Sequence, residues 1–235
     1  MHLSHLQYLP IAPLFFAALV AVFALLLIFI QLGVLRYAYT RLGVSSNTAL
    51  FLLFASLLGS YVNIPVAQFP EQNVMFGREV DYFGMRYVVP VLADWPGTVI
   101  ALNVGGAVIP ILLSVYLLSK NRVWPQGLLA IACLSAFCYW LATPVPGIGI
   151  ALPLLAPSIA AAIVAMIISR PNAAPLAYAG GSLGALIGAD LLNLPKIEGL
   201  GAPVASIGGA GTFDGIFLTG VIAVLIASFT GGRRG

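Results

Sequence analysis

Residues 11–35 read IAPLFFAALVAVFALLLIFIQLGVL, a stretch without a charged side chain, and the chain then becomes basic at Arg36 and Arg41. A helix needs about 20 mostly apolar residues to cross a bilayer. The stretch is too long for the apolar core of a cleavable signal peptide, which spans about 7–15 residues. We therefore expect residues 11–35 to form a membrane-spanning helix that ends at the basic pair.

The rest of the chain repeats this apolar pattern. Hydrophobic residues make up 61% of the sequence and charged residues 7%, whereas a soluble domain carries about 25% charged residues. Because backbone polar groups in lipid must bond within their own segment, continuous apolar runs favour helices. We expect a single polytopic membrane domain over residues 1–235, an all-α integral membrane bundle of about seven transmembrane helices near residues 11–35, 48–67, 97–118, 126–142, 150–168, 175–194 and 211–229.

The charged residues sort to two sides of this arrangement. Basic residues gather at cytoplasmic helix ends, and with seven spans one side receives Arg36, Arg41, Lys120, Arg122, Arg170, Arg233 and Arg234. The opposite side, or the outer half of the bilayer, receives the acids Glu71, Glu79, Asp81, Asp94, Asp190, Glu198 and Asp214. This sorting predicts a multi-pass protein of the plasma (inner) membrane, with the N-terminus outside and the C-terminus in the cytoplasm.

The longest connection, Gln68 to Pro96, joins the second and third spans on the outer side. It contains VMFGREVDYFGMRYVVPV, in which aromatic and β-branched residues alternate with charges and glycines. Gly77, Gly84 and Pro90 would interrupt a helix. The alternation favours a short external β-hairpin over a helix, and an irregular loop is the alternative.

Two acids fall within apolar spans, where ionisable groups are costly and are functional candidates by default. Asp190 lies in LGALIGADLLNLP near the outer end of the sixth span, and Asp214 lies in SIGGAGTFDGIFLTG at the start of the seventh. We expect both at similar depth. The structural alternatives are an acid that stabilises its helix N-terminus for Asp214, and an interfacial acid paired with Lys196 for Asp190.

Three asparagines lie at the same level, next to prolines and glycines that indicate irregular backbone. Such backbone at membrane depth is tolerated only against protein or a water-filled cavity. The functional interpretation is an externally open, polar and acidic cavity that binds a cation or small solute. The structural alternative is that the asparagines hold helices together by hydrogen bonds. The candidate binding residues are Asn63, Asn103, Asp190, Asn193 and Asp214.

A short internal echo links two of these regions. The stretch Asn103–Ala107 reads NVGGA, and the stretch Ser206–Ala210 reads SIGGA. Glycine pairs are common where helices approach closely. The alternative is a structural repeat of the kind that transporters use.

Other chemistries find little support. The basic residues occur singly or in pairs without interleaved aromatics, which argues against a nucleic-acid partner. The sequence has no zinc-binding spacing, P-loop, HExxH motif or serine elbow, and it leaves open whether a cofactor or a metal binds.

The motifs VNIPVAQ around Asn63, LNVGGAVIP around Asn103, LIGADLLNLP around Asp190 and SIGGAGTFDGIFLTG around Asp214 together carry a resemblance. The chain resembles an uncharacterised bacterial and archaeal multi-pass membrane family, the domain-of-unknown-function family sixteen-fourteen. The resemblance covers nearly the whole chain, and it implies a membrane location without an activity.

A second likeness is to intramembrane aspartyl proteases of the presenilin and signal-peptide-peptidase type. Those enzymes are similar in placing one aspartate on each of two neighbouring helices, as Asp190 and Asp214 do here. Two carboxylates in contact share a proton and can activate water as a catalytic pair. The chain departs from that pattern because Thr212 and Phe213 separate Gly211 from Asp214, Ala189 replaces the expected tyrosine, and no Pro-Ala-Leu motif follows.

Three functions stay open at this point. The first is transport or binding of a cation or small solute. The second is an intramembrane hydrolase with Asp190 and Asp214 as the catalytic residues. The third is a structural or regulatory membrane protein whose polar groups only connect helices.

Overall fold

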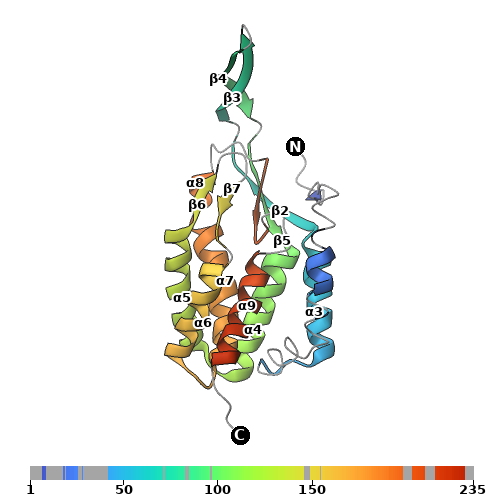
Figure 1. Ribbon diagram of the computed structural model, residues 1–235, viewed down its shortest axis with the longest axis vertical. Helices are drawn as coiled ribbons and strands as arrows, with labels where there is room; N and C mark the ends of the chain where they lie inside the picture. The colour runs from blue at the N-terminus through green and yellow to red at the C-terminus, as the bar shows by residue number, and fades with distance from the viewer. Residues whose placement is uncertain are drawn as a thin grey trace.

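The computed structural model describes residues 7–8, 18, 20–25, 28, 42–70, 72–82, 85–95, 97–145, 149–153, 155–197, 203–209 and 215–230. They form a mostly helical bundle with a small sheet at one end, and a long hairpin projects beyond that sheet (Figure 1). The prediction of a mostly helical chain is therefore confirmed.

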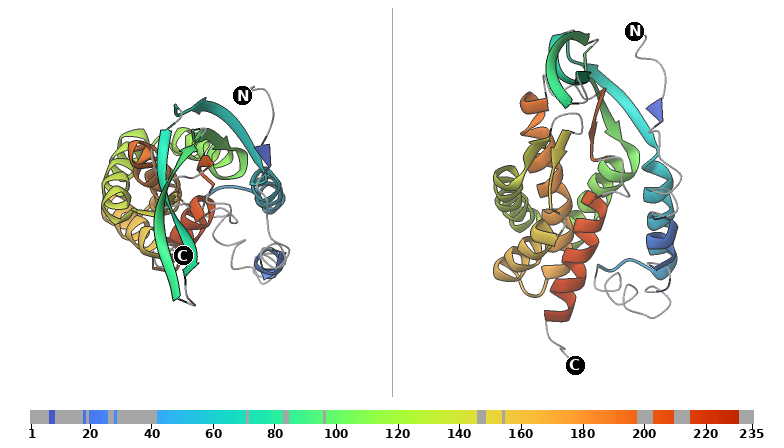
Figure 2. Two further views of the ribbon diagram at one scale, coloured as in Figure 1. Left: turned by 90° about the horizontal axis from the view of Figure 1, so that it is seen from above. Right: turned by 45° about the horizontal axis from the view of Figure 1, so that its top comes forward.

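The bundle is built from α3 (Ser46–Gly59), α4 (Ile109–Asn121), α5 (Trp124–Leu141), α6 (Leu155–Ile168), α7 (Ala173–Ala185) and α9 (Gly215–Thr230). Two π-helical segments extend these helices: η1 (Val104–Val108) leads into α4, and η2 (Leu186–Leu191) continues α7. The short helix α8 (Leu194–Ile197) follows η2. Viewed along the bundle, α3 lies to one side of the cluster formed by α4, α5, α6, α7 and α9 (Figure 2).

The number of membrane crossings is a separate question. Among the described residues, α5 is the one helix that is long and apolar enough to cross a bilayer, judged by length and composition. Val104–Lys120, Leu155–Ile168 and Thr219–Ser228 are shorter apolar helices. Residues 18, 20–25 and 28 of the first predicted span are helical, and the rest of that span lies outside the described residues. Seven spans stay a prediction.

The second and third predicted spans are wrong as continuous helices, and so is the all-α description. After α3 the chain enters strand β2 (Val62–Gln68), and strand β5 (Val99–Asn103) precedes η1. The two strands pair with each other, so their backbone groups are satisfied without a helix. Pro65 is accommodated because the ladder is irregular between Pro65 and Ala67, and a bulge tolerates the missing N–H. The fifth predicted span likewise begins as a strand, β7 (Gly149–Ala151), which pairs with β6 (Thr143–Val145).

The main sheet has four strands in the order β1-β2-β5-β8. The edge strands are β1 (Gln7–Tyr8) and β8 (Val204–Ile207). Strand β2 runs antiparallel to β1 and β5, whereas β8 runs parallel to β5. The sheet thus brings β1 near the start of the chain and β8 near its end together with the β2–β5 pair, at one end of the bundle.

The expected hairpin is present, and it is longer than a short connection. Strands β3 (Gln72–Tyr82) and β4 (Met85–Trp95) each have 11 residues and pair along their whole length. The backbone N–H of Phe69 donates to the carbonyl oxygen of Thr98 at 2.9 Å. This bond bridges the β2–β5 ladder and the β3–β4 ladder, so the two ladders follow one another in a single arm (Figure 1).

Helix α7 lies at the centre of the bundle. Twelve of its 13 residues are buried, Leu183 being the exception. Gly180, Gly184 and Gly188, spaced four residues apart, face α5. A Cβ on Gly184 would lie 2.4 Å from the Leu134 Cβ, and one on Gly188 would lie 2.2 Å from the Ser135 carbonyl oxygen. Small residues at this spacing let two helices approach closely, as in membrane helix pairs.

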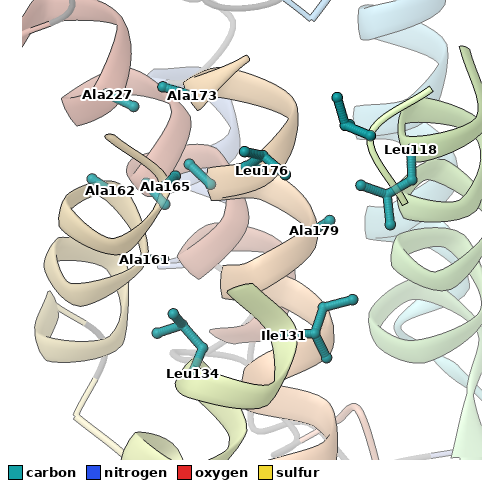
Figure 3. Packing of buried hydrophobic residues seen from close by; sticks show 13 residues of the cluster. Leu118, Ile131, Leu134, Ala161, Ala162, Ala165, Ala173, Leu176, Ala179 and Ala227 are labelled. Atoms are coloured by element: carbon teal, nitrogen blue, oxygen red, sulfur yellow. The ribbon is translucent and has the colours of Figure 1, made fainter. Parts of the chain in front are cut away.

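Alanines fill most of the remaining core, as Figure 3 shows for α6, α7 and α9. Ala161 and Ala165 of α6 are buried, as are Ala177 of α7 and Ala223 of α9. With such small side chains, packing depends on close backbone approach more than on interdigitated large residues. An added methyl group should therefore be poorly tolerated where two backbones meet.

We expect Gly184→Ala to lower the free energy of unfolding in detergent by about 1–3 kcal/mol relative to Gly180→Ala, the cost of overpacking. Both changes improve helix propensity equally. The difference arises because the new methyl group at residue 180 would lie 3.3 Å from the Ala130 Cβ, against 2.4 Å from the Leu134 Cβ at residue 184. Equal stability of the two variants would show that α5 and α7 are not packed in this way.

Candidate functional site

The predicted polar residues Asn63 and Asn103 meet at the end of the main sheet. They are register partners on β2 and β5, and both are buried. The Asn103 Nδ2 group donates to Asn63 Oδ1 at 3.2 Å, and the Ser206 hydroxyl of β8 donates to the same oxygen at 2.6 Å. Asn63 Oδ1 thus accepts two hydrogen bonds and links the strands β2, β5 and β8.

The Asn103 side chain also fixes the start of η1. Its Oδ1 accepts a hydrogen bond from the Gly106 N–H at 2.9 Å, as an N-cap residue does. Its Nδ2 donates a second bond, 2.8 Å long, to the Ser60 carbonyl oxygen at the end of α3. Both amide hydrogens and the amide oxygen are therefore engaged.

Close backbone contact accompanies these bonds. A Cβ on Gly105 would lie 2.1 Å from the Ser56 carbonyl oxygen, so α3 rests directly on η1. The Ser56 hydroxyl donates to the Gly105 carbonyl oxygen at 2.9 Å. Residue 105 has to be glycine because any side chain there would collide with the backbone of α3.

Two glycines of the SIGGA stretch, Gly208 and Gly209, lie against the NVGGA stretch. A Cβ on Gly208 would lie 2.6 Å from the Ala107 nitrogen, and one on Gly209 would lie 2.8 Å from Asn103 Nδ2. Gly208 has a φ of +84°, in the region that favours glycine. The NVGGA stretch begins at the last residue of β5 and the SIGGA stretch begins within β8, its parallel neighbour. The similarity therefore reflects two strand-end segments that lie side by side.

Asp190 joins this region from η2. It is half-buried, and its Oδ2 accepts a hydrogen bond of 2.6 Å from the Gly208 N–H, two residues after Ser206. The alternative partner considered from the sequence, Lys196, places its Nζ 4.3 Å from the ring centroid of Tyr139. We call the set Asn63, Asn103, Asp190, Ser206 and Gly208 the polar junction.

Asn193 has a different position from the other predicted residues. It is fully buried, and its Nδ2 donates to the carbonyl oxygens of Gly188 and Ala189 at 2.9 and 3.0 Å. It therefore satisfies backbone groups of η2, and its Oδ1 has no hydrogen-bond partner. Asp214, the second acid of the sequence prediction, lies outside the described residues.

Sequence reasoning did not select Ser206 and Gly208 as site residues. In the sequence, Ser206 stood out only as the first residue of the SIGGA echo. The pairing of β5 with β8 shows that this echo lies beside the NVGGA stretch. Among the described residues, no three His, Cys, Asp or Glu side chains are grouped as metal ligands. The polar junction offers amides, a hydroxyl, backbone N–H groups and a single carboxylate.

Comparison with known proteins gives one match. A family model described as "Protein of unknown function (DUF1614)" covers residues 57–226. The chain belongs to this family. The DUF1614 match extends from the end of α3 into α9 and includes every residue of the polar junction, and it confirms the family resemblance expected from the sequence. The likeness to intramembrane aspartyl proteases is not shown. No curated protein and no solved structure matches the chain.

We expect a double-mutant cycle to detect the bond between Asn63 and Ser206. Ser206→Ala should lower the free energy of unfolding by about 0.5–1.5 kcal/mol, the usual contribution of one hydrogen bond. After Asn63→Ala the same change should cost less, because the acceptor is already missing. Ser119→Ala, at an exposed site on α4, is the control and should be additive. Full additivity of Ser206→Ala and Asn63→Ala would contradict the described contact.

Proposed function

We propose that the chain is an integral membrane protein that binds a small cation, or the protonated amine of a small solute, at Asp190. The proposal has two parts, the membrane location and the binding site. They rest on different observations.

The membrane location is supported by the distribution of apolar side chains. Large hydrophobic residues are exposed on the outside of the helices, with Ile167 and Trp140 each 78% exposed and Phe51 70% exposed. Serines, in contrast, are buried inside the bundle, including Ser114, Ser158 and Ser182. In water so much exposed apolar surface would drive association. A surrounding of lipid removes that difficulty.

The orientation is supported by the placement of charge. Lys120 and Arg122 lie at the turn between α4 and α5, and Arg170 lies between α6 and α7. Both connections are at the end of the bundle opposite the hairpin (Figure 1). By the positive-inside rule this end faces the cytoplasm, so the sheet and the hairpin face outward.

The binding site rests on one observation, the environment of Asp190. Its carboxylate is half-buried on a π-helical segment and accepts a bond from the backbone of Gly208 on another segment. π-helical segments occur frequently at functional sites. An acid within a membrane bundle is expensive unless a cation or proton compensates it. A carboxylate held between two chain segments is suited to binding a small cation.

The asparagines of the polar junction have a different role in this proposal. The amide of Asn103 and the Oδ1 of Asn63 are engaged with protein groups. The Asn103 amide is saturated and the Asn63 oxygen already accepts two bonds, so these atoms connect elements and offer little to a ligand. The structural function considered from the sequence therefore describes these two residues, and ligand binding falls to Asp190.

We expect Asp190→Asn to abolish cation binding by the purified chain in liposomes, because the amide keeps the size of the side chain and removes its charge. Binding of Na⁺, K⁺ and methylammonium would be measured by calorimetry. The matched control is Ser206→Ala, which alters the same junction without changing its charge and should retain binding. Equal cation binding by wild type and Asp190→Asn would refute the site.

We also expect opposite accessibility for the two ends of the bundle in intact cells. A protease site inserted at the tip of the hairpin, between Tyr82 and Met85, should be cleaved by protease added from outside. A site inserted at Arg122 should be cleaved only after the membrane is opened. Cleavage of both sites from the same side would overturn the proposed orientation.

A further inference from the structure

The turn between α4 and α5 gathers cationic and aromatic side chains at one exposed place. Lys120 and Arg122 are exposed, and Trp124 opens α5 with 40% of its surface exposed. Tyr116, one turn before Lys120, is exposed as well. The cluster belongs to the end of the bundle that lies far from the polar junction (Figure 1).

Arg122 has an unusual backbone. Its φ of 54° and ψ of 40° place it in the left-handed region, and it is the only non-glycine residue with a positive φ in the described part of the chain. Glycine usually occupies such a position after a helix. An L-residue there costs roughly 1–2 kcal/mol. The backbone of the turn therefore disfavours an arginine, and a role of its guanidinium outside the turn would offset that cost.

The Lys120 ammonium is held beside the same turn. Its Nζ donates to the carbonyl oxygen of Gly43, just before α3, and lies 5.4 Å from the ring centroid of Tyr116. An ammonium has three N–H donors, and within the described ranges its contacts are a neutral carbonyl and a ring, neither of which carries a negative charge. Lys120 and Arg122 thus place two cationic side chains within three residues of one another.

Apolar side chains are also exposed beyond the turn on each of the two helices. Leu112 and Val115 are exposed on α4, and Leu128 and Leu129 are exposed on α5. In the chain, Trp124 lies between Arg122 and the exposed leucines of α5, and tryptophans are enriched at membrane interfaces. A phospholipid bound here would have its headgroup at the cationic turn and its acyl chains beside the exposed apolar side chains.

We propose that the α4–α5 turn is a binding site for an anionic phospholipid of the cytoplasmic leaflet. The Arg122 guanidinium and the Lys120 ammonium contact the headgroup phosphate, for which arginine is well suited because it can donate two parallel hydrogen bonds. The acyl chains lie against Trp124 and the exposed leucines. This inference rests on the proposed membrane location and is independent of Asp190.

The test uses the full chain in nanodiscs of phosphatidylcholine, with and without phosphatidylglycerol. Arg122→Gly is the informative variant, because glycine suits the left-handed backbone and the protein should fold at least as well as wild type. We expect phosphatidylglycerol to raise the Tm of wild type, and Arg122→Gly to bind this lipid about fivefold more weakly, equivalent to about 1 kcal/mol for one cation near the membrane surface. Arg170→Gln removes a cation at the same end away from the turn and should keep the full effect.

Three outcomes would overturn the lipid site. The first is a phosphatidylglycerol effect in Arg122→Gly as large as in wild type. The second is a loss of lipid binding in Arg170→Gln as large as in Arg122→Gly, which would indicate diffuse electrostatic attraction. The third is an effect of soluble glycerol phosphate as large as that of phosphatidylglycerol, which would indicate a site for free phosphate. Alkaline carbonate washing of membranes separates this result from the membrane proposal. A chain that is washed off refutes the membrane location itself, whereas a retained chain without lipid selectivity refutes only the site.

Discussion

The polar junction depends on a single constraint, the need of backbone groups in apolar surroundings to find partners. The Asn103 side chain meets this need for two separate segments, since it accepts from Gly106 and donates to the carbonyl of Ser60. Its contact with Asn63, which also accepts from Ser206, adds the strands β2 and β8. One amide therefore organises the end of α3, the start of η1 and the central strands of the sheet. A buried amide is costly when unpaired and valuable when every atom is paired.

The sequence predicted the helical character of the chain well because apolar runs of this length leave few alternatives. Helices α5, α6, α7 and α9 lie within or overlap the expected segments. The strands were missed because a continuous apolar run reads the same in a buried strand and in a buried helix. VNIPVAQ is rich in β-branched residues, yet its conformation is decided by β5, which lies more than 30 residues away in the chain. The hairpin was predicted, because its alternation is a local signal.

The candidate site was predicted only in part, for a related reason. Asn63, Asn103 and Asp190 stood out as polar residues in apolar surroundings, and they lie in one region. Their different roles were not visible. Whether the Asn103 amide is saturated depends on Ser60 as well as the nearby Gly106, and the second bond to Asn63 Oδ1 comes from Ser206, far along the chain. Glycine spacing in α7 could have predicted the close α5–α7 packing, but not which helix would be its partner.

The continuity of the arm has a consequence for the hairpin beyond its base. The Phe69–Thr98 bond closes the base of the hairpin, and the register of Asn63 with Asn103 is set below that point. Because these bonds involve no residue of the β3–β4 ladder, a change in the length of that ladder leaves the bonding of the base unaltered. The β3–β4 hairpin is thus separated from the helices by a base whose bonding does not involve the hairpin's far end.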